Sequence, residues 1–214
     1  MSSPKSADTS QPSVLGPTKN ILVLVSGNGT NLQALMDAEK TGGLGNKTML
    51  AAVLSDRSGT YALERAKSRG IPVFIEEPKY SLPKDERRTE HSNRILRLCR
   101  EKQINLIVFA GFLSILAGDI IKEYAGKMIN LHPALLPKFG GHGMYGERVH
   151  RAVLKAGETE SGCTVHLVDE GTDSGPILLQ RRVPVLPGDT PESLAQRIHR
   201  EEHIAIVEGV KMMS

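Results

Sequence analysis

The sequence predicts an α/β fold with a doubly wound, mainly parallel sheet and an antiparallel C-terminal extension. Three observations lead to this prediction. Short apolar runs alternate with helical patterns along residues 20–156, which is typical of parallel strands joined by helical crossovers. The apolar runs are continuous, as in strands that are covered on both faces. Residues 161–185 hold two strand-like runs joined by a short acidic loop, which favours an antiparallel pair.

A glycine-rich turn, SGNGTN at residues 26–31, links the first expected strand to the first expected helix. The strand is the apolar run at residues 20–25, and the helix is the amphipathic stretch at residues 32–40. The backbone N–H groups of such a turn, together with the helix dipole, bind anions such as phosphate. The turn is neither a Walker A loop nor G-x-G-x-x-G, so a tight turn without a ligand is an equally strong interpretation.

Strands and helices continue to alternate after this turn. Expected strands lie at residues 48–54, 71–75 and 104–110, and expected helices lie at residues 60–69, 86–102 and 115–124. Gly70 ends the second helix, because glycine readily adopts the left-handed conformation of a helix C-terminus. This regular alternation is the main support for parallel winding.

The fifth expected strand is residues 128–131, within the stretch MINLHPALLPKF. Pro133 and Pro137 cannot sit in the middle of a sheet, so the strand stops at about His132. Asn130 and His132 then lie at the carboxyl end of the strand, where open α/β sheets bind ligands. The two residues are two positions apart, so their side chains leave the same face.

Beyond the fifth strand, the sequence predicts a flexible glycine-rich loop at residues 138–146 and a helix at residues 147–156. Two antiparallel strands follow at residues 161–169 and 175–185, and a last helix begins at residue 190. The acidic loop DEGTDSG joins the two strands and contributes Asp173. Thr190, followed by Pro191 and Glu192, is a good start signal for the last helix.

Composition indicates an ordinary globular protein of 214 residues, with 24% charged residues and a formal net charge of +3. The basic excess is spread along the chain, so it predicts no nucleic-acid surface. The longest apolar stretch, residues 106–117, is too short to span a membrane. We expect residues 1–19 to form a flexible tail and residues 20–214 to form one domain. Two cysteines far apart in the sequence indicate free thiols in a reducing, cytoplasmic setting.

Asn130, His132 and Asp173 are the candidate catalytic residues. An amide can donate to a carbonyl oxygen that gains charge, and an imidazole can move a proton near neutral pH. Asp173 would raise the pKa of His132 by stabilising the imidazolium. No G-x-S-x-G elbow is present, which favours direct transfer between two bound substrates over a covalent intermediate. The alternatives are a structural histidine at a strand end and a turn aspartate.

A metal site is the other use for the histidines. His199 and His203 are four residues apart on the last expected helix and in principle share one face. The chain has no zincin pattern, and we expect no metal.

Three stretches resemble one enzyme family: NLHPALLPKF, DEGTDSGPI and SGNGTNLQAL. Together they closely resemble the phosphoribosylglycinamide formyltransferases, over about residues 20–210. The first two stretches are shared by the wider formyltransferase group and indicate the chemistry. SGNGTNLQAL and the later REEHIAIVE are more particular to this family and indicate the substrate.

The resemblance implies a Rossmann-like formyltransferase fold. It also implies direct transfer of a formyl group from 10-formyltetrahydrofolate to the glycinamide amine of phosphoribosylglycinamide, through a tetrahedral intermediate. Asn130, His132 and Asp173 match the catalytic residues, with His132 as the proton donor. The positions that match the substrate site are Gly27, Asn28, Gly29, Thr30, Asn31 and Glu202. The positions that match the folate site are Arg88, Phe112, Leu113, Ser114, Ile115, Leu116, Asp169, Glu170, Gly171 and Thr172.

Two features depart from the family pattern. Ser114 stands where family members often carry arginine, and the segment GGHGMYGERVH, residues 140–150, is longer than in short members. We expect small-molecule substrates, no nucleic acid or membrane partner, and a monomer or weak homodimer. The alternatives are a formyltransferase acting on methionyl-tRNA or a nucleotide sugar, a formyltetrahydrofolate hydrolase, and a non-catalytic folate- or nucleotide-binding protein. The tRNA enzyme and the hydrolase would each carry a further domain.

Overall fold

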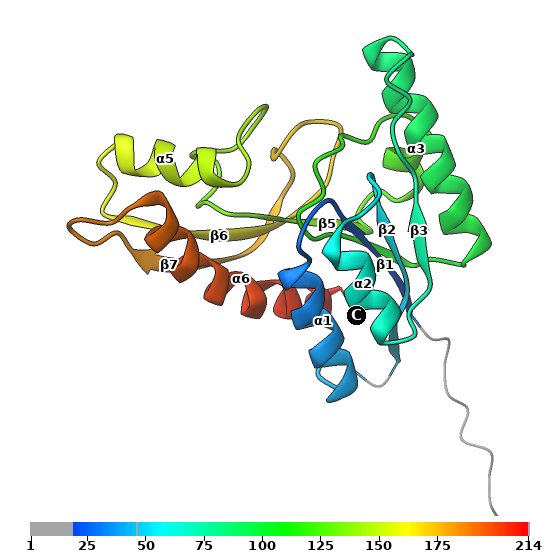
Figure 1. The fold of residues 1–214 in the computed structure, drawn as a ribbon, viewed down its shortest axis with the longest axis horizontal. Coiled ribbons are helices and arrows are strands. Elements are labelled where there is room, and N and C mark those ends of the chain that lie inside the picture. Colours follow the sequence, from blue (N-terminus) through cyan, green and yellow to red (C-terminus); the bar gives the residue numbers. More distant parts are fainter. Residues whose placement is uncertain (1–18, 46, 214) are drawn as a thin grey trace, which may run out of the picture.

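The computed structural model describes residues 19–45 and 47–213, so the expected tail at residues 1–19 lies almost wholly outside the described residues. The described chain forms one seven-stranded sheet flanked by helices (Figure 1). Its strands are β1 Lys19–Val25, β2 Thr48–Ser55, β3 Val73–Ile75, β4 Leu106–Phe109, β5 Met128–His132, β6 Glu160–Leu167 and β7 Ile177–Pro184. Its helices are α1 Thr30–Lys40, α2 Tyr61–Ser68, α3 Lys84–Glu101, α4 Asp119–Glu123, α5 Glu147–Lys155 and α6 Pro191–Met212.

The strand order is β3-β2-β1-β4-β5-β6-β7. All pairings from β3 to β5 are parallel, and β6 and β7 are added antiparallel. The predicted fold class, a mainly parallel doubly wound sheet with an antiparallel extension, is confirmed. The chain winds outward from β1 to β3 and then returns to β4 on the other side of β1. This reversal opens a crevice at the carboxyl ends of β1 and β4, where ligands bind in such folds.

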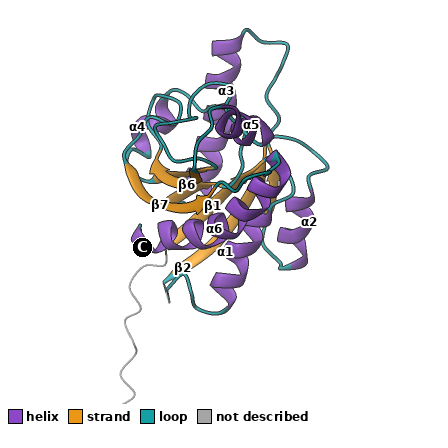
Figure 2. Cartoon of the chain, turned by 90° about the vertical axis from the view of Figure 1, so that its left-hand side faces the viewer, coloured by secondary structure: helices purple, strands orange, loops and turns teal. Residues whose placement is uncertain are grey.

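The two faces of the sheet are covered by different helices (Figures 1 and 2). Ile21 and Val23 of β1 pack with apolar residues of α1, α2 and α6, whereas Leu22 and Leu24 pack with those of α3 and α4. All four of these side chains are fully buried. Burial on both faces explains the continuous apolar run in β1, because alternate residues serve opposite layers.

The predicted helix at residues 115–124 is wrong in its first half. Helix α4 begins only at Asp119, after Gly118 with φ 79°. The N–H of Ala117 donates to Ser92 Oγ of α3 at 2.8 Å, so a side chain replaces a helical carbonyl as its partner. Residues 111–117 are therefore not helical, and residues 111–116 line the crevice. No helix among residues 19–45 and 47–213 is long and apolar enough to cross a membrane.

Thr190 is the N-cap of α6, and we predict that it contributes to stability. Its Oγ1 accepts from the Ser193 N–H at 3.2 Å, and Ser193 Oγ accepts from the Thr190 N–H at 3.0 Å. Loss of an N-cap hydroxyl typically costs about 1 kcal/mol, so Thr190→Ala should lower the free energy of unfolding in urea by about that amount. Thr190→Ser keeps the hydroxyl and should match the wild type. Equal unfolding midpoints for all three proteins would contradict this prediction.

Candidate active site

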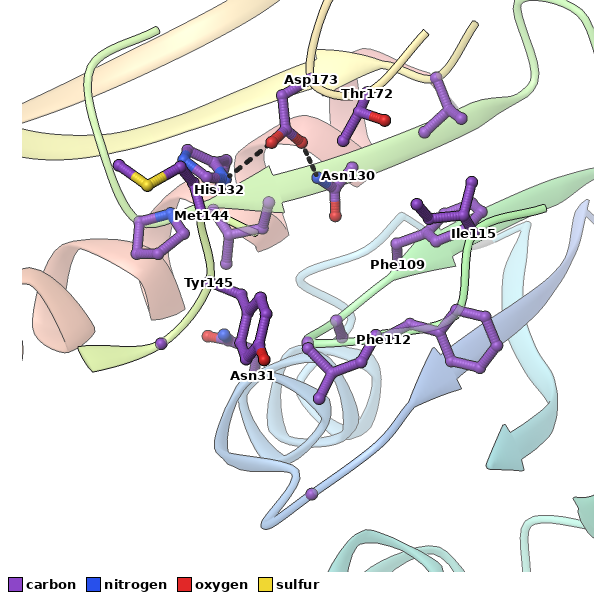
Figure 3. Close-up of a pocket in the computed structure, with 18 of the residues that line it drawn as sticks. Asn31, Phe109, Phe112, Ile115, Asn130, His132, Met144, Tyr145, Thr172 and Asp173 are labelled. Carbon is purple, nitrogen blue, oxygen red and sulfur yellow. Dashed lines mark hydrogen bonds and ion pairs between the residues drawn. The ribbon is translucent and has the colours of Figure 1, made fainter. Parts of the chain in front are cut away.

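A pocket of about 630 Å³ opens at the carboxyl ends of β1, β4 and β5 (Figure 3). Its volume is within the range of small-molecule sites. It brings together most of the predicted site residues: Gly27, Asn28, Gly29, Thr30, Asn31, Phe112, Leu113, Ser114, Ile115, Leu116, Asn130, His132, Asp169, Gly171, Thr172, Asp173 and Glu202. Arg88 on α3 and the exposed Glu170 do not line it.

The three candidate catalytic residues meet at the Asp173 carboxylate (Figure 3). One carboxylate oxygen lies 3.4 Å from His132 Nδ1, and the other accepts from Asn130 Nδ2 at 3.3 Å. The strand therefore directs Asn130 and His132 to the same side, as their spacing predicted. His132 is only 3% exposed, so its contacts are largely shielded from water.

The loop between β6 and β7 holds Asp173 in a defined position. Asp173 has φ 57°, a left-handed conformation that aspartate tolerates better than most residues. Asp169 Oδ1 accepts from the Gly171 N–H at 2.9 Å and from Ser174 Oγ at 2.8 Å. At Gly175 a Cβ would lie 1.9 Å from the Leu167 carbonyl oxygen, so only glycine fits there. These local constraints direct the carboxylate toward β5.

Burial and the charge of Asp173 shift the pKa of His132 in opposite directions. Its Nε2–H donates to the Phe139 carbonyl at 2.8 Å, so an attractive contact between Nδ1 and Asp173 needs a second proton on the ring. Burial nevertheless lowers the pKa of His132 below its ordinary value, and the charge of Asp173 only partly offsets this. The expected raising effect of Asp173 is present, but the net shift has the opposite sign.

The pKa of Asp173 is below its ordinary value. Burial is the largest single influence and raises this pKa, but its polar neighbours, among them His132 and the Gly141 N–H, together lower it further. The Gly141 N–H donates to Asp173 Oδ2 at 3.0 Å. The site therefore keeps Asp173 ionised at neutral pH.

Asn130 also contacts His166, which is not among the predicted site residues. The two residues face each other across the β5–β6 ladder, and Asn130 Nδ2 lies 3.0 Å from His166 Nε2. The other N–H of the Asn130 amide donates to Asp173, so both N–H groups of this amide are used within the protein. The expected donation from Asn130 to an oxyanion is thus not available in this arrangement. Only the antiparallel register, invisible in the sequence, could have identified His166.

The turn after β1 is shaped for close approach by an anion. Gly29 has φ 72°, and a Cβ there would lie 2.6 Å from Ala62 Cβ, so glycine is required. Arg65 Nε donates to the Asn28 carbonyl at 2.9 Å and anchors the turn to α2. Helix α1 starts at Thr30 without a side-chain cap or an acidic residue in its first turn. Its first N–H groups and positive dipole end thus favour an anion in the adjoining pocket.

Glu202 and His199 of α6 lie beside this turn. Glu202 is 4% exposed, and its Oε2 lies 2.6 Å from His199 Nδ1 and 3.5 Å from Asn31 Nδ2. The hydrogen bond that His199 donates to Glu202 raises the pKa of His199. No group of three or more metal-ligating side chains occurs among the residues the structure describes. The predicted substrate residue Glu202 is therefore brought to the same end of the pocket as residues 27–31.

The segment after β4 forms the opposite wall. The Leu113 N–H donates to Ser26 Oγ at 2.8 Å, and Ser114 Oγ donates to Asp56 Oδ2 at 2.7 Å. Asp56 is 4% exposed and also pairs with Arg57 at 3.0 Å. Ser114, which stands where an arginine is common, thus ties this apolar wall to the end of β2.

The glycine-rich segment between β5 and α5 lines part of the pocket through residues 141–146. Tyr145 is 45% exposed and lies under Arg148, whose guanidinium carbon is 4.9 Å from the ring centroid. The sequence analysis did not predict several residues that line the pocket: Met144, Tyr145, Arg148, His150, His166 and His199. The only indication in the sequence was that they lie close to predicted site residues.

The model of the formyl transferase family matches residues 19–210. The chain belongs to the formyl transferase family.

Related formyl transferases match nearly the whole described chain. Phosphoribosylglycinamide formyltransferase of Escherichia coli is 36% identical over 86% of this chain and 82% of its own length. The trifunctional purine biosynthetic protein adenosine-3 of Drosophila pseudoobscura pseudoobscura is 43% identical over 92% of this chain, which spans 14% of that protein. The structure of glycinamide ribonucleotide transformylase 1 from Symbiobacterium toebii superposes with a TM-score of 0.82, at 36% identity, over 92% of this chain and 87% of that one.

Asp173→Asn should lower the pKa of His132 further, because the charge that stabilises the imidazolium is removed. The pKa can be followed by NMR titration of the His132 ring. Asp169→Asn is the matched control, since Asp169 lies in the same loop but bonds Gly171 and Ser174. A pKa of His132 that rises or stays constant in Asp173→Asn would contradict the role assigned to Asp173.

Proposed function

We propose that this chain transfers a formyl group from 10-formyltetrahydrofolate to the glycinamide amine of phosphoribosylglycinamide. The observation that carries the proposal is the junction of Asn130 and His132 at the ionised Asp173, between an anion-binding turn and an apolar wall. The resemblance of the chain to named phosphoribosylglycinamide formyltransferases supports the substrate.

The two ends of the pocket fit the two substrates. Residues 27–31 and the start of α1 would hold the phosphate, and the buried carboxylate of Glu202 would accept hydrogen bonds from the ribose hydroxyls. Residues 112–116 and 169–172 would hold the folate, with apolar side chains against its rings. The glycinamide amine and the formyl group would then meet at Asp173.

The reaction needs one new bond, one broken bond and one moved proton. The amine nitrogen attacks the formyl carbon, and the carbonyl electron pair moves to oxygen, giving a tetrahedral intermediate. When protonated, His132 stabilises this oxygen by donating from Nδ1, which makes only a long 3.4 Å contact with Asp173, while Nε2–H stays on the Phe139 carbonyl. The ionised Asp173 receives the amine proton directly or through a water. The electron pair on oxygen then re-forms the carbonyl, and the bond between the formyl carbon and folate N10 breaks. N10 takes the proton that Asp173 received, directly or through a water.

The cellular setting is part of the proposal. Cys99 and Cys163 are both buried and unpaired, which fits a reducing compartment such as the cytoplasm. We propose a monomer or weak homodimer that works on small molecules, within one domain that spans residues 20–214.

A formyl-transfer assay tests this function. Purified protein with 10-formyltetrahydrofolate should turn over only when phosphoribosylglycinamide is added, as followed by folate absorbance. Parallel reactions offer water alone or methionyl-tRNA. His132→Ala should lose most turnover yet still bind both substrates. Folate release without an acceptor would indicate a hydrolase, and binding without turnover in the wild type would indicate a non-catalytic binding protein.

Ser114→Ala tests the folate wall. A hydrogen bond to a charged group is worth about 1.5–3 kcal/mol, and its loss at Asp56 should loosen residues 112–116. We expect the KM for the formyl folate to rise by roughly 3- to 10-fold, because only part of the energy of that hydrogen bond is used to hold the folate wall. The KM for phosphoribosylglycinamide should not change. Asp56→Asn keeps an acceptor for Ser114 and should have a smaller effect. Equal increases in both KM values would indicate general damage to the site.

A further inference from the structure

His166 is a buried, polar neighbour of the reacting centre to which the proposed reaction assigns no role. It is 2% exposed and stands opposite Asn130 in the β5–β6 ladder. Its Nδ1 lies 2.8 Å from the Leu167 carbonyl oxygen. Because a carbonyl oxygen can only accept, Nδ1 carries a proton. In the neutral ring, Nε2 is then a bare acceptor.

This tautomer decides how the Asn130 amide is turned. Nε2 of His166 accepts from Asn130 Nδ2 at 3.0 Å, and the carboxylate of Asp173 accepts from the same nitrogen at 3.3 Å. An amide turned the other way would place its oxygen against two acceptors. Buried polar atoms that face each other without a proton between them are costly. Two independent acceptors therefore hold the amide nitrogen inward.

The oxygen of Asn130 consequently faces the substrates. Figure 3 shows this atom directed away from Asp173 and into the pocket. Resting on the proposed function, we propose that His166 is a positioning residue that fixes the Asn130 amide with its oxygen toward the attacking amine. That oxygen accepts a hydrogen bond from the amine N–H and orients the nitrogen lone pair toward the formyl carbon. His132 is left as the side-chain donor to the developing oxyanion.

Two substitutions at residue 166 separate the two contacts of the ring. The amide of glutamine reaches the place of Nε2, so His166→Gln keeps an acceptor for Asn130. The amide of asparagine reaches the place of Nδ1, so His166→Asn keeps only the donor to the Leu167 carbonyl. His166→Asn should lower kcat by about 10- to 100-fold, less than the roughly 100- to 1,000-fold that follows the loss of a whole oxyanion-hole donor. His166→Gln should keep most of kcat, and both variants should keep both KM values.

A double-mutant cycle with Asn130→Ala tests whether His166 acts through Asn130. If it does, adding His166→Asn to Asn130→Ala should change kcat by no more than about 2- to 3-fold, since there is no amide left to orient. Independent, multiplying losses would overturn the proposal and indicate action through Asp173, whose carboxylate lies 3.6 Å from His166 Nε2. Unchanged kcat in His166→Asn, with Asn130→Ala impaired, would also overturn it. An unimpaired Asn130→Ala would instead remove Asn130 from the proposed reaction.

A measurement on the unaltered protein keeps the proposal testable if a variant fails to fold. Nitrogen-15 NMR of the imidazole distinguishes a protonated nitrogen from a bare one. The proposal requires that the imidazole proton of His166 be on Nδ1 and that Nε2 be bare. A proton on Nε2, in either the other neutral tautomer or the imidazolium, would overturn it, because His166 could then donate to the oxygen of Asn130.

Discussion

The ionised carboxylate of Asp173 is the constraint on which the rest of the site depends. A buried carboxylate is tolerated only when several donors surround it. Here Asn130 Nδ2 and the Gly141 N–H donate to it, and His132 Nδ1 lies beside it. These partners come from β5 and from the loop that follows it. The contacts of this one carboxylate therefore join β5, the glycine-rich segment and the β6–β7 loop.

The fold supplies these partners through its change from parallel to antiparallel pairing. Parallel winding brings the ends of β1, β4 and β5 to one edge, which places the glycine turn after β1 near the end of β5. The antiparallel β6 then runs back along β5 and sets His166 against Asn130. The following loop returns Asp173 to the same edge. A further parallel strand with a helical crossover would not place both residues there.

Sequence patterns predicted much of this arrangement because their causes are local. The two-residue spacing of Asn130 and His132 and the prolines after them predicted a shared face at a strand end. The glycine turn before α1 was predicted as a tight turn, and Gly29 has no room for a Cβ; the anion site in this turn stays a prediction. The helix predicted from residue 115 was wrong in part, because Ser92 of α3 binds the Ala117 N–H. No local pattern contains that distant hydroxyl.

The sequence alone determined the parallel winding, the identity of the candidate catalytic residues and the family resemblance, since periodicity, turn chemistry and motifs are properties of neighbouring residues. Only the tertiary structure decided the balance of forces at the site. The net shift of the His132 pKa depends on how completely the fold buries the ring. The direction of the Asn130 amide depends on which acceptors the sheet register places beside it. Both depend on distances between residues remote in the sequence, because burial and hydrogen bonding are decided by where the packed chain leaves each group.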